Sequence, residues 1–128
     1  DSGLVCYLLG IREPAQLRHH PLRGAIFESW MVTEYYKKQI HRGREPSLFH
    51  FRETRGLEID LVQPDADRTI LMEAKSGETI GSDFFSGLGK MEQLLAETDA
   101  PPVEKRIIYG GSEALTRNGV KLIPWSQV

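Results

Sequence analysis

The segments GLEIDLV (residues 56–62) and TILMEAK (residues 69–75) decide the fold expected for this chain. Apolar and polar residues alternate over residues 57–61 of the first and 72–75 of the second, and a period of two residues is typical of β-strands. The sequence Pro-Asp-Ala-Asp at residues 64–67 predicts a turn between them. The preceding segment, LFHFRE (residues 48–53), alternates in the same way. Together the three segments predict an antiparallel meander with short connections.

Two amphipathic helices flank these strands along the chain. Apolar residues recur every three or four positions over residues 24–40 and again over residues 83–97, which predicts a helix in each range. Ser82 or Asp83 is expected to cap the second helix, because short polar side chains satisfy the free amides of a first turn.

Shorter elements complete the predicted order. An apolar segment at residues 2–10 predicts a short helix that ends at Gly10. Residues 106–110 and 120–125 predict two further strands. The order α-β-β-β-α-β-β indicates an α/β fold in which helices flank a central mixed sheet.

Length and composition indicate one compact domain over residues 1–128. The chain has 40% apolar and 27% charged residues, which is ordinary for a globular domain. Its single cysteine, Cys6, excludes an internal disulfide and a multi-thiolate zinc site, and we expect a cytoplasmic location. No apolar run approaches about 18 residues, which excludes a membrane span. Because the chain begins at Asp1 without a leader, we interpret it as a piece of a longer protein.

Two carboxylates and a lysine carry the chemistry on the predicted strands. Alternation places Glu58, Asp60 and Val62 on one face of their strand, with Ile59 and Leu61 on the other. On the next strand, Leu71, Glu73 and Lys75 share a face. We therefore expect Asp60 and Glu73 to be near neighbours.

Two carboxylates held close together need compensation. At a separation of about 4 Å, two unit charges repel by about 4 kcal/mol at an effective dielectric constant of about 20. Lys75 is one candidate for the compensating charge, and a hard divalent cation such as Mg²⁺ is the better one, since it accepts one or two carboxylates plus waters and phosphate oxygens. The alternative is that these charges only solvate an exposed face of the hairpin.

The same residues carry a resemblance to a known family. GLEIDLV (56–62) followed by MEAKSG (72–77), after a helix with FESWMVTEYY (27–36), resembles the PD-(D/E)XK nuclease superfamily. The chain resembles more closely the uncharacterised C-terminal domain of prokaryotic AAA-type ATPases, in its first ten residues, the central GLEIDLV and EAKSG, and the segment RIIYGG (106–111). The likeness spans nearly the whole chain, although Ile59 stands where the superfamily has a proline.

The resemblance implies a restriction-endonuclease-like core and Mg²⁺- or Mn²⁺-dependent cleavage of phosphodiesters in DNA. Asp60 and Glu73 would be metal ligands, with the carbonyl of Ala74 as a third. Lys75 would assist catalysis, and Glu28 on the first long helix would support the metal or its waters. The implied parent is an ATPase whose motor domain lies upstream.

A basic cluster is the candidate nucleic-acid interface. Lysine and arginine side chains near the end of the first long helix and on the following strand could contact a phosphate backbone, or they could simply form a solvated surface. The residues are Lys37, Lys38, Arg42, Arg44, Arg52 and Arg55. The segment SGLGKM (86–91) is not a nucleotide-binding loop, because Phe84 stands where the first glycine is required.

Two other functions remain open. The domain could be a catalytically silent DNA-binding or protein-docking module of the same fold. It could also mediate homo-oligomerisation of its parent, which predicts an exposed apolar patch around Leu4, Tyr7 and Leu8. The implied partners are therefore DNA, an upstream ATPase domain and a second copy of the chain, and no membrane.

Overall fold

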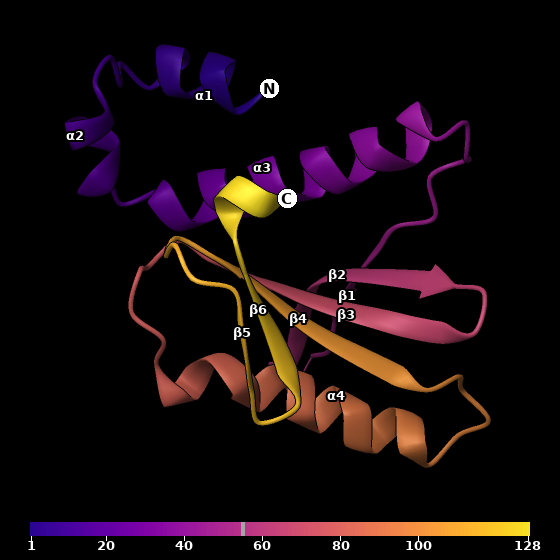
Figure 1. The fold of residues 1–128 in the computed structure, drawn as a ribbon. Helices are drawn as coiled ribbons and strands as arrows, with labels where there is room; N and C mark the ends of the chain where they lie inside the picture. Colours follow the sequence, from indigo (N-terminus) through magenta and orange to yellow (C-terminus); the bar gives the residue numbers. More distant parts are fainter. Residues whose placement is uncertain (55) are drawn as a thin grey trace.

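A computed structural model describes residues 1–54 and 56–128 of the chain. It shows a six-stranded sheet in the order β1-β2-β3-β4-β6-β5, with helices on both faces. Helix α3 (Arg23–His41) crosses one face and helix α4 (Ser86–Ala96) lies on the other (Figure 1). This confirms the predicted α/β class with a central mixed sheet. The strands are β1 (Phe49–Arg52), β2 (Glu58–Asp65), β3 (Arg68–Lys75), β4 (Val103–Tyr109), β5 (Leu115–Arg117) and β6 (Val120–Pro124).

The sheet combines antiparallel and parallel pairing. Strands β1, β2 and β3 form an antiparallel meander, as predicted from their alternation. Strand β4 then pairs parallel to β3, and β6 pairs parallel to β4. A parallel pair requires a crossover, and α4 supplies it between β3 and β4. The short strand β5 forms the far edge of the sheet, antiparallel to β6.

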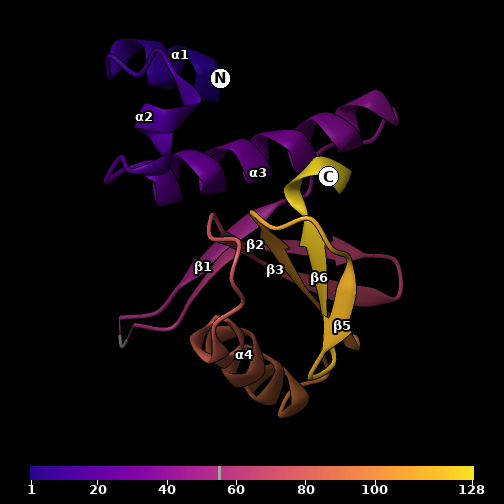
Figure 2. The same cartoon turned by 60° about the vertical axis from the view of Figure 1, so that its left-hand side comes forward.

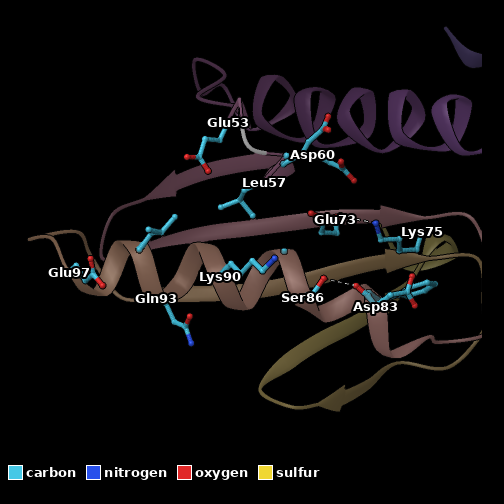
Figure 3. Close-up of a pocket in the computed structure, with 15 residues that line it drawn as sticks. Glu53, Leu57, Asp60, Glu73, Lys75, Asp83, Ser86, Lys90, Gln93 and Glu97 are labelled. Carbon is cyan, nitrogen blue, oxygen red and sulfur yellow. Dashed lines mark hydrogen bonds and ion pairs between the residues drawn. The ribbon is translucent and has the colours of Figure 1, made fainter.

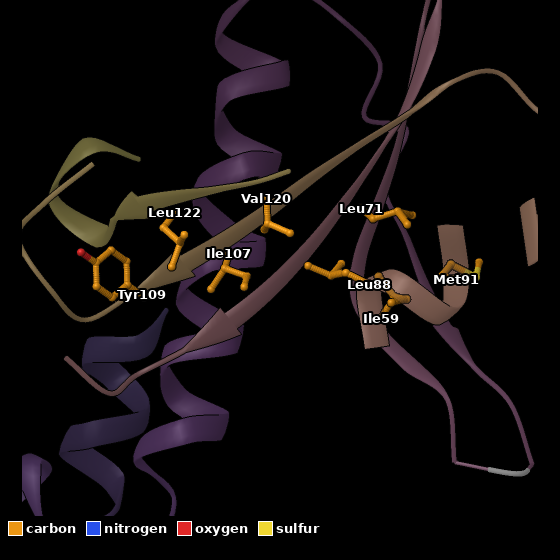
Figure 4. Packing of buried hydrophobic residues seen from close by; sticks show 8 residues of the cluster. All are labelled: Ile59, Leu71, Leu88, Met91, Ile107, Tyr109, Val120 and Leu122. Carbon is orange, nitrogen blue, oxygen red and sulfur yellow. The ribbon is translucent and has the colours of Figure 1, made fainter. Parts of the chain in front are cut away.

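Each face of the sheet has its own apolar core. On the α4 face, Leu88 and Met91 of the helix pack against the sheet (Figure 4). On the α3 face, Met31 and Tyr35 do the same. The buried strand residues of the first cluster are Ile59, Leu71, Ile107, Tyr109, Val120 and Leu122, and those of the second are Leu61, Ile70, Met72 and Ile108. Strand β3 contributes to both clusters, because successive residues face opposite sides.

The predicted assignment of β2 side chains to the two faces of the sheet is wrong for one pair of residues. Ile59 and Leu61 were predicted to share a face, but they belong to different cores. The reason is a shift in the β1–β2 register: Phe49 pairs with Val62, whereas Phe51 pairs with Ile59. A bulge of this kind adds one residue to one strand and reverses the alternation beyond it. The irregularity falls at Asp60.

The N-terminal helices lie outside the three layers. Helix α1 (Ser2–Leu8) and helix α2 (Pro14–Arg18) pack beyond α3, on its side away from the sheet (Figure 2). The short helix predicted at residues 2–10 is thus confirmed, and Gly10 beyond its end has a positive φ of 75°. Leu4, Tyr7 and Leu8 are exposed, and Leu8 is 74% accessible. The exposed patch expected around these three residues is present.

Three local expectations require correction. Helix α4 begins at Ser86, after a 3-10 turn at Ser82–Phe85, and neither Ser82 nor Asp83 caps it. The turn between β2 and β3 is tighter than predicted, because β2 continues to Asp65. Helix α2 and strand β5 are additional elements, too short to show a clear period in the sequence.

The ends of β3 and β4 approach each other closely. The amide of Gly110 donates to the carbonyls of Lys75 and Gly77, both at 3.0 Å. A Cβ atom at position 110 would collide with the carbonyl of Ser76. Glycine is therefore required where the chain leaves β4.

Within residues 1–54 and 56–128, no helix has the length and apolar character needed to cross a bilayer.

Replacing the buried side chain that anchors α4 should destabilise the fold. We expect Leu88→Ala to lower the free energy of unfolding by about 2–5 kcal/mol, since it leaves a cavity in a fully packed core. Leu94→Ala on the same helix is the matched control, because Leu94 is 48% exposed and its loss should change stability by about 0.5 kcal/mol or less. Urea unfolding measures both. Equal losses would contradict the placement of α4.

Candidate metal and catalytic site

A cavity of about 670 Å³ lies between α4 and the ends of β2 and β3. Asp60, Glu73 and Lys75 line it together (Figure 3). We refer to it as the carboxylate cavity, because six acidic side chains and only two lysines line it among the described residues. The structure thus brings three of the four predicted catalytic residues to one place.

Asp60 is positioned by an interruption in the sheet. Pairing between β2 and β3 extends from Asp65/Arg68 to Leu61/Met72 and stops there. The next amide of β3 that faces β2 belongs to Ala74, and it donates to Oδ2 of Asp60 at 2.7 Å. The carboxylate thus takes the place of a strand carbonyl, because a buried amide requires an acceptor. This bond fixes Asp60 at the point where the strands separate.

Glu73 and Lys75 lie on the same face of β3, two residues apart. Glu73 is only 7% exposed, so it is not a solvated surface charge. The Nζ atom of Lys75 donates to Oε2 of Glu73 at 2.8 Å and lies 5.9 Å from the ring centre of Phe84. The lysine compensates part of the negative charge of the cavity.

The two carboxylates are hard to ionise in this environment. Burial raises the pKa of Asp60, and this outweighs the Ala74 amide and the charge of Lys75, which lower it. Burial also raises the pKa of Glu73, and the charge of Asp60 raises it further. Burial alone would lower the pKa of Lys75, but its hydrogen bond to Glu73 and the nearby carboxylates raise it above 10.5. The lysine is therefore a permanent cation, and the acids favour a partner that stabilises their charge.

Glu28 approaches the cavity from the other layer of the fold. It lies on α3, is partly buried and does not line the carboxylate cavity. Burial raises its pKa, and the charges of Asp60 and Glu58 raise it further, whereas His50 and Lys75 lower it. Glu28 is thus within electrostatic reach of Asp60, but it makes no direct contact with the pair of carboxylates among the described side chains.

Ala74 presents its backbone to the same gap. In an extended strand the N–H and C=O of one residue point to the same edge. Since the Ala74 amide donates to Asp60, the carbonyl of Ala74 also faces the region where β2 has separated from β3.

The predicted nucleic-acid residues do not gather at the cavity. Lys37 pairs with Glu34 at 2.7 Å, Lys38 lies over the ring of Tyr35, and Arg52 is 3.8 Å from Glu58. Arg42 and Arg44 are exposed where α3 ends. Lys37 is nine residues beyond Glu28, which corresponds to about 14 Å along a helix. None of these five residues lines the carboxylate cavity, and Arg55 lies outside the described residues.

Sequence reasoning missed three residues that contribute to this site. Lys90, on α4, lines the cavity, whereas the sequence pattern gives it only a place in the predicted helix over residues 83–97. Asp83, predicted as a helix cap, lines it too and helps to raise the pKa of Lys75. His50 of β1 lies 3.5 Å from Glu58 and favours ionisation of Asp60. Only the register of β1 against β2 could have indicated that His50 lies near this site.

The donor set fits a hard cation with few protein ligands. No group of three or more acidic, histidine or cysteine side chains in the described part of the chain is arranged to hold a metal. The donors that remain for a cation are two carboxylates and a backbone carbonyl. Proteins typically bind Mg²⁺ through one or two carboxylates, because the ion keeps several of its waters. A structural zinc site is unsuitable here, since it requires four nitrogen or sulfur ligands.

Residues 23–128 match a family described as a domain of unknown function, DUF4143. The chain belongs to the DUF4143 family. Such domains are commonly the C-terminal part of AAA-type ATPases, which confirms the coarser part of the resemblance seen in the sequence. No curated protein matches the chain. The match covers the sheet with α3 and α4, whereas α1 and α2 precede it.

Removing one negative charge from the cavity should stabilise the metal-free DUF4143 domain. Because the pKa of Asp60 is raised in the folded chain, its stability is greatest when Asp60 is protonated and declines as pH rises through the folded-state pKa. Asp60→Asn mimics the protonated form and can still accept from the Ala74 amide. We expect it to unfold at a higher temperature at pH 7, by the equivalent of about 0.5–2 kcal/mol.

The difference should shrink as the pH falls through the raised pKa of Asp60 toward 3.8, the ordinary value for an aspartate, because the wild-type side chain then takes up a proton. Thermal melts in EDTA from pH 3.5 to 8 measure this. Asp99→Asn is the control, as Asp99 is exposed. A variant less stable than wild type at neutral pH would contradict the assignment.

Proposed function

We propose that this DUF4143 domain hydrolyses phosphodiester bonds in nucleic acid, with DNA as the expected substrate, and that it requires a divalent cation. The observation that carries the proposal is the convergence of Asp60, Glu73 and Lys75 on one cavity. A carboxylate pair beside a fixed ammonium group is suited to a reaction in which negative charge develops on a phosphoryl group. The order of these residues on β2 and β3 also agrees with the resemblance to PD-(D/E)XK nucleases.

Asp60 and Glu73 would hold Mg²⁺ or Mn²⁺, with the carbonyl of Ala74 as a further ligand. A cation held there would polarise the phosphoryl group. Burial of the two carboxylates supports this assignment, because it raises the pKa of both and a cation held between them would offset that cost.

The side chains of the protein would then have distinct roles. Glu73 holds the ammonium group of Lys75 by the bond from Nζ to Oε2. Lys75 would donate from Nζ to the phosphoryl oxygens as their charge increases, and its raised pKa keeps it protonated throughout. Glu28, with its own raised pKa, would act on the waters around Asp60 rather than on the substrate.

The rival function is a silent module that docks DNA or protein. Two observations favour it: the predicted basic residues lie away from the cavity, and α1 exposes Leu4, Tyr7 and Leu8. A cavity lined by six acids and two lysines also repels a polyanion until a cation enters it. Turnover therefore decides between the two functions.

Cation binding and cleavage should depend on the same carboxylate. We expect the wild-type chain to bind Mn²⁺ at millimolar concentration in calorimetric titration and to cleave labelled single-stranded, duplex or branched DNA. Asp60→Asn should lose metal binding and cleavage together. Lys75→Ala should keep metal binding and reduce the rate at least about 100-fold, since it removes charge stabilisation at the reacting group.

Asp99→Asn serves again as the control and should bind and cleave like wild type. The metal site is refuted if the wild type binds no Mn²⁺, or if Asp60→Asn binds it equally well. Binding of metal without cleavage of any substrate would support the silent module.

A further inference from the structure

A second cavity, of about 410 Å³, lies between α1, α2, α3 and the C-terminal 3-10 turn, Trp125–Gln127. Three aromatic residues line it: Phe27 and Trp30 of α3 and Trp125 of the turn. The ring centres of Phe27 and Trp30 are 5.5 Å apart, and those of Trp30 and Trp125 are 6.1 Å apart in an edge-to-face arrangement. We call this the aromatic cavity. Trp125 is 51% exposed, so part of its side chain is accessible to a ligand.

Two arginines give the aromatic cavity a positive wall. Arg18 and Arg23 both line it. The guanidinium of Arg23 donates to the carbonyls of Arg18 and Ser76, which fixes its position, and Arg18 itself is exposed. Glu78 is the acidic residue of the lining among the described residues. Flat apolar faces beside guanidinium groups favour a planar aromatic ligand that carries an anion.

The aromatic and carboxylate cavities share no lining residue among those the structure describes, but neighbouring residues at the end of β3 and on α3 connect them. Lys75 lines the carboxylate cavity, and the next residue, Ser76, lines the aromatic one. On α3, Phe27 lines the aromatic cavity, whereas the next residue, Glu28, senses the charge of Asp60. At the end of β3 and on α3, two residues adjacent in sequence thus belong to different sites, one to the carboxylate site and the other to the aromatic cavity.

We propose that the aromatic cavity binds an unpaired nucleobase and its phosphate from the strand that enters the carboxylate cavity. The base would stack on Trp125, and the phosphate would face Arg18 and Arg23. A base paired within a closed duplex cannot stack on a protein ring, so the substrate class is single-stranded or frayed nucleic acid. The link to cleavage rests on the proposed function, whereas binding of a nucleotide does not.

Both tryptophans of the chain line this cavity, so intrinsic fluorescence reports on it directly. In EDTA, dAMP should quench the fluorescence saturably and bind about tenfold more tightly than deoxyadenosine or deoxyribose 5-phosphate, because each of these lacks one half of the recognised group. Arg18→Ala should weaken dAMP binding about threefold or more, and Arg117→Ala, an exposed arginine outside the cavity, should not.

Trp125→Ala tests the stacking and requires calorimetry, since it removes one reporter. We expect this substitution to weaken the binding of dAMP about fivefold or more. It should also reduce the preference for binding a single-stranded oligonucleotide over its blunt duplex. Absence of saturable quenching, or wild-type affinity in both variants, overturns the inference. Nucleotide binding without DNA cleavage would refute only the proposed function. Cleavage with an unchanged KM in Arg18→Ala and Trp125→Ala would refute only the aromatic cavity.

Discussion

The hydrogen bond from the Ala74 amide to Asp60 is the contact on which the site depends. At this point β2 leaves β3, and a buried amide would otherwise lack an acceptor. The carboxylate of Asp60 supplies the acceptor, so the group that completes the hydrogen bonding of the sheet also lines the cavity. The bulge in the pairing of β1 with β2 accompanies this bond. It allows Ile59 and Leu61 to enter opposite cores while Asp60 remains between them. A substitution that removes this acceptor therefore disturbs the sheet and the site together.

Much of the fold follows from local patterns. The period of two located β1, β2 and β3, and the three-to-four-residue period located α3 and α4, because side chains alternate across a strand and one face of each helix packs on the sheet. The facing of Leu71, Glu73 and Lys75 was likewise predictable, since β3 is regular throughout. The shared cavity of Glu73 and Asp60 followed from the same reasoning, although Asp60 reaches it from an irregular strand.

The remaining features depend on contacts between segments distant in sequence. The bulge at Asp60 is set by the register of β1 on β2, which no pattern within β2 reveals. Lys90 and Asp83 enter the cavity only because α4 packs across it, and the sequence shows them as surface charges of a helix. The start of α4 was misplaced because a 3-10 turn also satisfies the first free amides, without the side-chain cap that the prediction required.

The close approach at Gly110 has a consequence for any survey of tolerated substitutions. A side chain there would displace the carbonyl of Ser76, and with it the backbone that carries Lys75. A substitution at position 110 would therefore have an effect like that of a change at Lys75, although the glycine has no side-chain functional group of its own. For the proposed nuclease activity, a loss on mutation would thus mark steric support as well as chemistry, and a comparison of cation affinity with turnover would separate the two.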